Sequence, residues 1–198
     1  MIIETKTAKK EKIEIYADGE FMFTVPAVIW YSSRFRDGDD VMQEELSVLK
    51  EQGDSFMAYE SAMRMLSLRA HSKYEMTVKL SAKFSKDAAK AAVNRLENAG
   101  LLDDERFALL LAQELYERKG YAPQRILFEL KNRGITGNYA ENAVNALDID
   151  KEISIIRVIE KCGINENSTI KEKNRVIRRL INMGYSFSDI SKYINIYE

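Results

Sequence analysis

The chain has 198 residues, of which 45% are hydrophobic and 31% are charged. Thirty Lys and Arg residues almost balance 31 Asp and Glu residues, so the formal net charge is −1. This composition excludes a wholly disordered chain and a globally basic nucleic-acid binder. Only two prolines and nine glycines occur, and this scarcity favours a mainly helical protein.

One cysteine, Cys162, and one histidine, His71, exclude a disulfide framework and a metal site built from these residue types. Neither a glycine-rich phosphate loop nor a nucleophile motif occurs, so we expect a protein that is not an enzyme and has no cofactor. We also expect a cytoplasmic protein, since the sequence has no long apolar run and no signal peptide at its start.

The first 55 residues are predicted to form an N-terminal extension. Residues 12–26 alternate between apolar and polar, and Asp18-Gly19 between the two runs is a strong signal for a β-hairpin. Residues 2–7 can add a third strand. A hairpin is marginally stable alone, so we expect it to dock on the helices.

Helical patterns follow the hairpin. We expect a short helix at residues 27–35 and a second helix at about 41–51, with Asp39 or Asp40 as its N-cap. Gly53-Asp54-Ser55 is expected to end this segment.

From residue 56 onward the sequence repeats with a period of 50 residues. The apolar sets are Met76, Leu80 and Phe84, then Ile126, Leu130 and Gly134, then Val176, Leu180 and Gly184. Such self-similarity indicates stacked copies of one supersecondary unit.

The period divides the chain into repeats at 56–102, 103–147 and 148–198, each with three helices. The expected helices are 56–70, 73–84, 86–98, 104–118, 123–133, 138–147, 150–162, 169–183 and 187–196. The fold class is therefore mainly all-α: three tandem three-helix repeats in an elongated array, with a small N-terminal β-hairpin extension.

Basic residues are the candidates for binding a partner. Residues 56–102 contain eight Lys and Arg against four Asp and Glu, and the densest set comprises Lys73, Lys79, Lys83, Lys86, Lys90 and Arg95. Lys79 and Lys83, like Lys86 and Lys90, are four residues apart and are expected to share a helix face. They fit phosphates or an acidic protein surface, but an ordinary solvated helix face explains them equally well.

The other repeats add smaller sets. The second repeat contributes Arg125, Lys131 and Arg133, and the third contributes Arg175, Arg178 and Arg179 beside Lys171 and Lys173. Arginine suits bidentate binding of phosphate or carboxylate groups. Glu172 lowers the net positive charge of the third set, so an ordinary solvated surface remains an alternative explanation for these residues.

Acidic and polar residues at helix starts have structural explanations. Asp103, Asp104 and Glu105 are typical of a helix N-terminus rather than a metal site. Ser72 and Glu75 have the spacing of a capping box, and the adjacent His71 lacks the partners that catalysis needs.

Residues 58–147 resemble the RecX family of regulators of the RecA recombinase. The resemblance is carried by Arg69-Ala70-His71-Ser72-x-x-Glu75-Met76, by Gly100-Leu101-Leu102-Asp103-Asp104-Glu105-Arg106-Phe107-Ala108, and by Glu129-Leu130-Lys131-x-Arg133-Gly134-Ile135. Phe84 departs from the family pattern, which commonly has glycine at that position.

The resemblance implies a non-enzymatic negative regulator that binds in the groove of the RecA–single-stranded DNA filament. It would limit ATP hydrolysis, strand exchange and the SOS co-protease activity, with RecA and single-stranded DNA as partners and no membrane partner. We expect a monomer.

Two alternatives remain. The helix-turn-helix-like repeats are also compatible with a stand-alone DNA-binding module, whose affinity would fall steeply with salt. The hairpin is compatible with an interaction scaffold that recruits another strand at its edge.

Overall fold

The computed structural model describes residues 1–165 and 167–194. It is mainly helical with one small antiparallel sheet, which confirms the expected fold class. The chain divides into two compact units, Met1–Asp103 and Asp104–Glu198. The units are described separately below.

The sheet has three strands in the order β1 (Ile3–Ala8), β2 (Lys12–Ala17) and β3 (Glu20–Pro26). Asp18 and Gly19 have φ values of 50° and 80°, the left-handed backbone that a tight two-residue hairpin turn needs. The predicted hairpin and its third strand are therefore confirmed.

Residues 37–41 cover the first part of the outer edge of β1, as far as Thr5. The Ile3 amide donates to the Asp39 carbonyl at 2.9 Å, and the Thr5 amide donates to the Asp37 carboxylate at 2.6 Å. A paired edge is unavailable for strand addition, and this disfavours β1 as a recruiting edge.

The predicted N-cap at Asp39 or Asp40 was wrong. Helix α2 (Gln43–Leu68) begins after Met42, whose amide donates to the Glu45 carboxylate at 2.9 Å. Asp39 instead accepts from the Arg36 amide, and Asp40 accepts from the N-terminal ammonium at 2.7 Å. These competing donors occupy both carboxylates.

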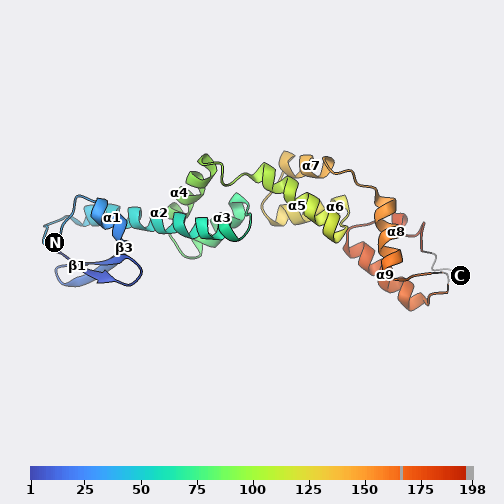
Figure 1. Cartoon of the computed structure of the whole chain (residues 1–198), viewed down its shortest axis with the longest axis horizontal. Helices are drawn as coiled ribbons and strands as arrows, with labels where there is room; N and C mark the ends of the chain where they lie inside the picture. Colours follow the sequence, from blue (N-terminus) through green and yellow to red (C-terminus); the bar gives the residue numbers. More distant parts are fainter. Residues whose placement is uncertain (166, 195–198) are drawn as a thin grey trace. The chain divides into compact units, whose positions relative to one another are not determined.

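The sheet docks on helices, but on α1 (Ala27–Ser32) and the first half of α2 within the N-terminal extension and not on the core of the first repeat. Its buried face and the helices α1 and α2 form one core, in which Trp30, Leu46 and Leu49 are at most 5% exposed. Figure 1 shows the sheet (dark blue) alongside the first half of α2.

Helix α2 is continuous, so the predicted break at Gly53–Ser55 was wrong. Gly53 is buried within the helix, where a Cβ atom would lie 2.8 Å from Cγ1 of Val25 in β3. Glycine at this position therefore allows the helix and the strand to pack closely together. The proposed domain boundary at 55/56 consequently falls inside α2, and the division into four parts stays a proposal.

The repeats follow the predicted helices closely. Beyond α2, the helices are α3 (Lys73–Ser81), α4 (Lys86–Asn98), α5 (Asp104–Lys119), α6 (Pro123–Asn132), α7 (Asn138–Asn145), α8 (Lys151–Lys161), α9 (Ile170–Asn182) and α10 (Phe187–Ile190). The helix expected at 187–196 is shorter as far as it is described, since α10 ends at Ile190 and residues 195 and 196 lie outside the described residues.

The repeat period corresponds to equivalent core positions. Met76, Leu80, Ile126, Leu130, Val176 and Leu180 occupy the middle helices α3, α6 and α9, and each is at most 4% exposed. The first two members of each set that defined the period therefore form the centre of each repeat, whereas the third members, Phe84, Gly134 and Gly184, are half-buried and follow the middle helices.

Within the C-terminal unit, the second and third repeats pack against each other through the segment before α6. The Ala122 amide donates to the Met183 carbonyl at 2.9 Å, and the Tyr185 hydroxyl donates to the Gly120 carbonyl at 2.8 Å. Ala122 is fully buried in the core of the third repeat. At Gly184, a Cβ atom would lie 2.7 Å from Cβ of Arg125, so only glycine permits this approach.

The Gly53–Val25 contact gives a stability prediction. Gly53→Leu should lower the free energy of unfolding by about 1–3 kcal/mol, since the added side chain overpacks a closed helix–strand contact. Val25→Ala should relieve part of this loss in the double variant. Denaturant unfolding measures both effects, and Gln52→Leu on the exposed neighbouring position is the matched control. Equal losses at positions 52 and 53 would contradict this explanation.

Candidate functional site

The basic residues of the first repeat lie on two helices and the turn between them. Lys79 is exposed on α3, and Lys86 and Lys90 are exposed on one face of α4. Lys83 follows the end of α3 at Ser81, so the prediction that Lys79 and Lys83 share a helix face was wrong. The chain turns there because the amides of residues 83 and 84 both bond to the Leu80 carbonyl.

Two members of this set have structural contacts. The Lys73 ammonium pairs with the Glu97 carboxylate at 2.9 Å and so links α3 to α4. The Arg95 guanidinium lies 3.9 Å from the centre of the Tyr59 ring, which links α4 to α2. Cations in such contacts are less available to a partner than the exposed lysines.

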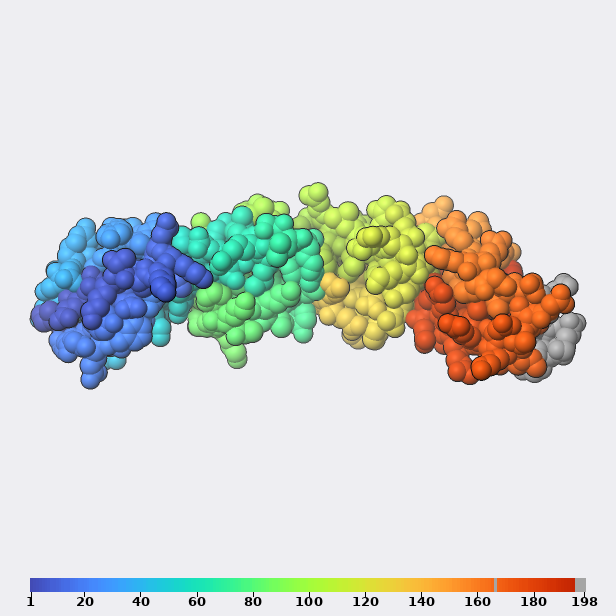
Figure 2. Space-filling view, turned by 60° about the horizontal axis from the view of Figure 1, so that its bottom comes forward, coloured from blue at the N-terminus to red at the C-terminus, as the bar shows by residue number. Residues whose placement is uncertain are grey.

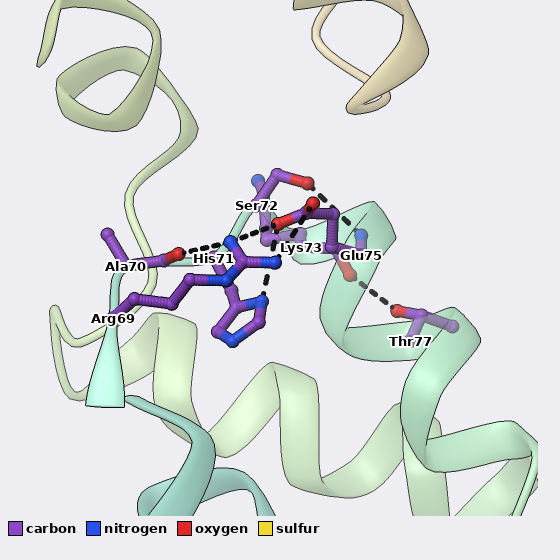
Figure 3. A network of polar contacts seen from close by, with 7 residues as sticks. All are labelled: Arg69, Ala70, His71, Ser72, Lys73, Glu75 and Thr77. Atoms are coloured by element: carbon purple, nitrogen blue, oxygen red, sulfur yellow. Dashed lines mark hydrogen bonds and ion pairs between the residues drawn. The ribbon is translucent and has the colours of Figure 1, made fainter. Parts of the chain in front are cut away.

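His71 and its neighbours form a polar network at the start of α3 (Figure 3). The Ser72 hydroxyl accepts from the Glu75 amide at 3.1 Å, which caps the helix as predicted. The Glu75 carboxylate accepts from the Arg69 guanidinium at 3.1 Å and lies 3.2 Å from Nδ1 of His71. Since a carboxylate only accepts, Nδ1 carries the proton. The motif thus fixes the turn between α2 and α3.

The His71 ring is buried, and its pKa is lowered from the ordinary value. Burial is the main cause, because it disfavours the charged imidazolium, and the positive charges of Arg69 and Lys79 act in the same direction. Glu75 opposes them but does not outweigh them. The ring is therefore a neutral structural group at neutral pH.

A basic groove lies in the C-terminal unit, between the start of α6 and one face of α9. Its volume is about 1110 Å³, and its lining residues are Tyr121, Arg125, Ile170, Lys171, Asn174, Arg175, Arg178, Arg179, Asn182 and Met183. Five of these residues are cations and none is acidic. This groove brings Arg125 together with the α9 arginines, which the sequence assigned to separate sets.

Arg125 is held in a defined position at the groove. Its Nη2 donates to the Glu129 carboxylate at 2.6 Å, one helical turn further along α6. Its guanidinium carbon lies 5.5 Å from the centre of the Tyr121 ring and 5.2 Å from that of Phe128. The buried Nε has no hydrogen-bond acceptor among the described residues, so the guanidinium keeps unused donor capacity.

Glu172 forms no ion pair with the α9 arginines among the described residues. Its carboxylate accepts from the amide and the hydroxyl of Thr169, at 2.9 Å and 2.8 Å, and caps α9. These hydrogen bonds lower the pKa of Glu172, because they stabilise the ionised form. Among the described residues, Arg175 and Arg178 have no ion-pair partner. Their charges remain available to a ligand.

Lys131 and Arg133 lie apart from the groove lining. Lys131 is exposed in the last turn of α6, and Arg133 is the half-buried C-cap of that helix. The residues that sequence reasoning missed are Tyr121, Asn174 and Asn182. The 50-residue period relates Arg125 to Arg175 and Tyr121 to Lys171, but equivalent positions in two repeats carry no information about contact between them.

Other kinds of site find no support in the described residues. No group of three or more His, Cys, Asp or Glu side chains within residues 1–165 and 167–194 is arranged to hold a metal ion. None of the helices in those ranges is long and apolar enough to cross a membrane.

Family models describe the first two repeats. The model for "RecX, first three-helix domain" matches residues 58–96, and the model for "RecX, second three-helix domain" matches residues 103–144. A "Regulatory protein RecX" from Salmonella arizonae is 33% identical over 143 residues, which cover 66% of this chain and 86% of the relative. The chain belongs to the RecX family.

Other RecX proteins are similar over nearly the full length. The "Regulatory protein RecX" of Caldanaerobacter subterraneus subsp. tengcongensis is 25% identical over 96% of both chains. A crystal structure of regulatory protein RecX has a TM-score of 0.66 at 18% identity and covers 97% of this chain and 96% of its own. A crystal structure of RecX from Lactobacillus salivarius has a TM-score of 0.58 at 23% identity and covers 70% and 93%. These structures share the fold.

The His71 network gives a prediction of pH dependence. In the unfolded chain His71 binds a proton near pH 6.5, whereas its lowered pKa keeps it neutral in the folded chain to lower pH. The unfolded state is therefore favoured as the pH falls below about 6.5. Denaturant unfolding between about pH 7.5 and 5.5 should show this loss of stability, and His71→Gln should remove the part that His71 contributes. An unchanged pH profile in the variant would contradict the assignment.

Proposed function

We propose that this protein is a negative regulator of RecA that binds in the groove of the RecA–single-stranded DNA filament. There it limits ATP hydrolysis, strand exchange and the SOS co-protease activity. The observation that carries this proposal is membership of the RecX family, whose similar members are named regulatory proteins. The exposed basic residues within each unit support the proposal, because cations are attracted to the acidic groups of a nucleoprotein filament.

We further propose that the protein acts as a cytoplasmic monomer by binding rather than by catalysis. Its one histidine is buried and pairs with Glu75, and this arrangement fits a structural role better than proton transfer to a substrate. The four-part organisation, with repeats at 56–102, 103–147 and 148–198, would then present several weak contacts along one partner.

A stand-alone DNA-binding module is the second candidate. The observation in its favour is the groove at α9, whose five cations meet no carboxylate in the lining. A protein of this kind would bind bare DNA without RecA and would lose affinity steeply with salt. The formal net charge of −1 makes a purely electrostatic DNA binder the weaker choice.

The filament proposal predicts the effect of reversing charges on the exposed basic surfaces. A variant with Lys79→Glu, Lys83→Glu, Arg178→Glu and Arg179→Glu should raise the concentration needed to inhibit RecA's DNA-dependent ATP hydrolysis by about tenfold or more, since each reversal replaces attraction with repulsion. Titration of the protein into RecA on single-stranded DNA measures this change.

A control variant, Lys9→Glu with Lys10→Glu, changes two exposed lysines at the β1–β2 turn and should leave inhibition within about twofold of the parent chain. Thermal unfolding verifies that both variants are folded. Inhibition of RecA by the folded fourfold variant at the parent concentration would refute the assignment of these residues.

A further inference from the structure

The second and third repeats depend on each other unequally. The core of the second repeat is formed by residues between 107 and 149, and among the described residues no side chain of the third repeat belongs to it. The core of the third repeat, in contrast, includes the fully buried Ala122 of the second repeat, and Tyr121 packs against it. The second repeat can therefore keep its core without the third, whereas the third loses a buried residue when the two separate.

The hydrogen bonds that join the two repeats are made by one short segment of each. The Ala122 amide and the Gly120 carbonyl bond to residues 183 and 185, which follow α9. The chain itself connects the repeats through residues 146–150, which lie between α7 and α8 and outside both helices. Residues outside helices can absorb the backbone rotation that separation of the repeats requires. The two repeats can therefore separate while the second repeat stays folded.

Contact between the repeats also brings positive charges together. The groove between α6 and α9 has Arg125 on the side of the second repeat, and its lining contains no carboxylate. The cations on the side of the third repeat are Lys171, Arg175, Arg178 and Arg179. Like charges in one groove repel each other, although solvent and salt weaken the repulsion between exposed side chains. Glu129 pairs with Arg125 and offsets part of this repulsion. The buried contact is therefore formed against an electrostatic cost.

We propose that the third repeat opens and closes on the second repeat as one unit. The buried contact around Ala122 favours closure, and the repulsion across the groove opposes it. Because the lining of the groove comes from both repeats, the groove exists only in the closed state. Opening of the third repeat thus controls whether this surface is present, and any condition that weakens the repulsion favours the closed state. The inference does not depend on the proposed function, since its test requires neither RecA nor DNA.

Hydrogen exchange of the full chain, read in separate peptides of α5, α7, α8 and α9, tests the unequal dependence. Ala122→Gly removes a buried methyl group from the core of the third repeat and leaves glycine at the N-cap of α6, where glycine is at least as favourable as alanine. Protection of the α8 and α9 amides should fall by about threefold or more, as expected for the loss of one buried methyl group. Protection of α5 and α7 should change by less than about twofold. Equal changes in all four helices, or no change in any, would overturn the inference.

A second variant tests the repulsion across the groove. Arg175→Gln with Arg178→Gln removes two groove charges from exposed positions of α9 without adding an acidic group. Protection of α8 and α9 should rise by about twofold to fivefold, since closure then brings fewer like charges together. The matched control, Arg157→Gln with Lys173→Gln, removes the same charge from the third repeat outside the groove lining and should stay within about 1.5-fold of the parent chain. A fall or no change in the groove variant, or an equal rise in the control, would contradict the proposal.

Salt dependence of the same exchange gives an independent readout. Raising NaCl from about 0.05 M to about 0.5 M screens the charges of exposed side chains. Protection of α8 and α9 in the parent chain should therefore rise by about twofold, and the rise should be smaller in the groove variant. Helices α5 and α7 are the internal reference, because a salt effect common to the whole unit appears there as well. A salt effect that is equal in all four helices, or equal in the parent chain and the groove variant, would refute the role of the groove charges.

Discussion

The structure depends on chain segments that are shared between neighbouring hydrophobic cores. Each repeat has buried residues at the centre of its middle helix. The sharing takes a different form in each of the two units. In the N-terminal unit, one long helix, α2, serves both the sheet core and the first repeat. In the C-terminal unit, residues before α6 insert into the core of the third repeat.

The contact between the second and third repeats also forms the groove between α6 and α9. Ala122 is buried in the third repeat, and Gly184 allows the end of α9 to approach the backbone of α6. These contacts bring Arg125 to the face of α9, where Glu129 holds its guanidinium. Figure 2 shows residues of the third repeat (orange to red) adjoining those of the second repeat (yellow) at the surface. The basic groove therefore forms where residues of the second repeat complete the core of the third.

Much of the fold could be predicted because its signals are local. The Asp18-Gly19 turn, the Ser72 cap and the apolar spacing around Met76, Ile126 and Val176 each act over a few residues. Two of the failures involved partners distant in sequence, since Asp40 pairs with the N-terminal ammonium and Gly53 contacts Val25. Gly53 resembled a helix break because nothing local reveals its contact with Val25.

The candidate site likewise has features that the sequence predicts and features that it does not. Its arginines could be listed from the sequence, since an uncompensated basic helix face is a local pattern. The position of Arg125 beside the α9 residues could not be predicted from the sequence. Periodicity identifies equivalent positions in the repeats but does not indicate which of them lie together. The motif that carried the family resemblance, Arg69 to Glu75, proved to fix a helix turn. Val78, Phe128 and Arg178, by contrast, are exposed on the middle helices and do not form that turn. The repeats can therefore keep one architecture while each presents different chemistry, and a functional surface need not coincide with the motifs that identify the family.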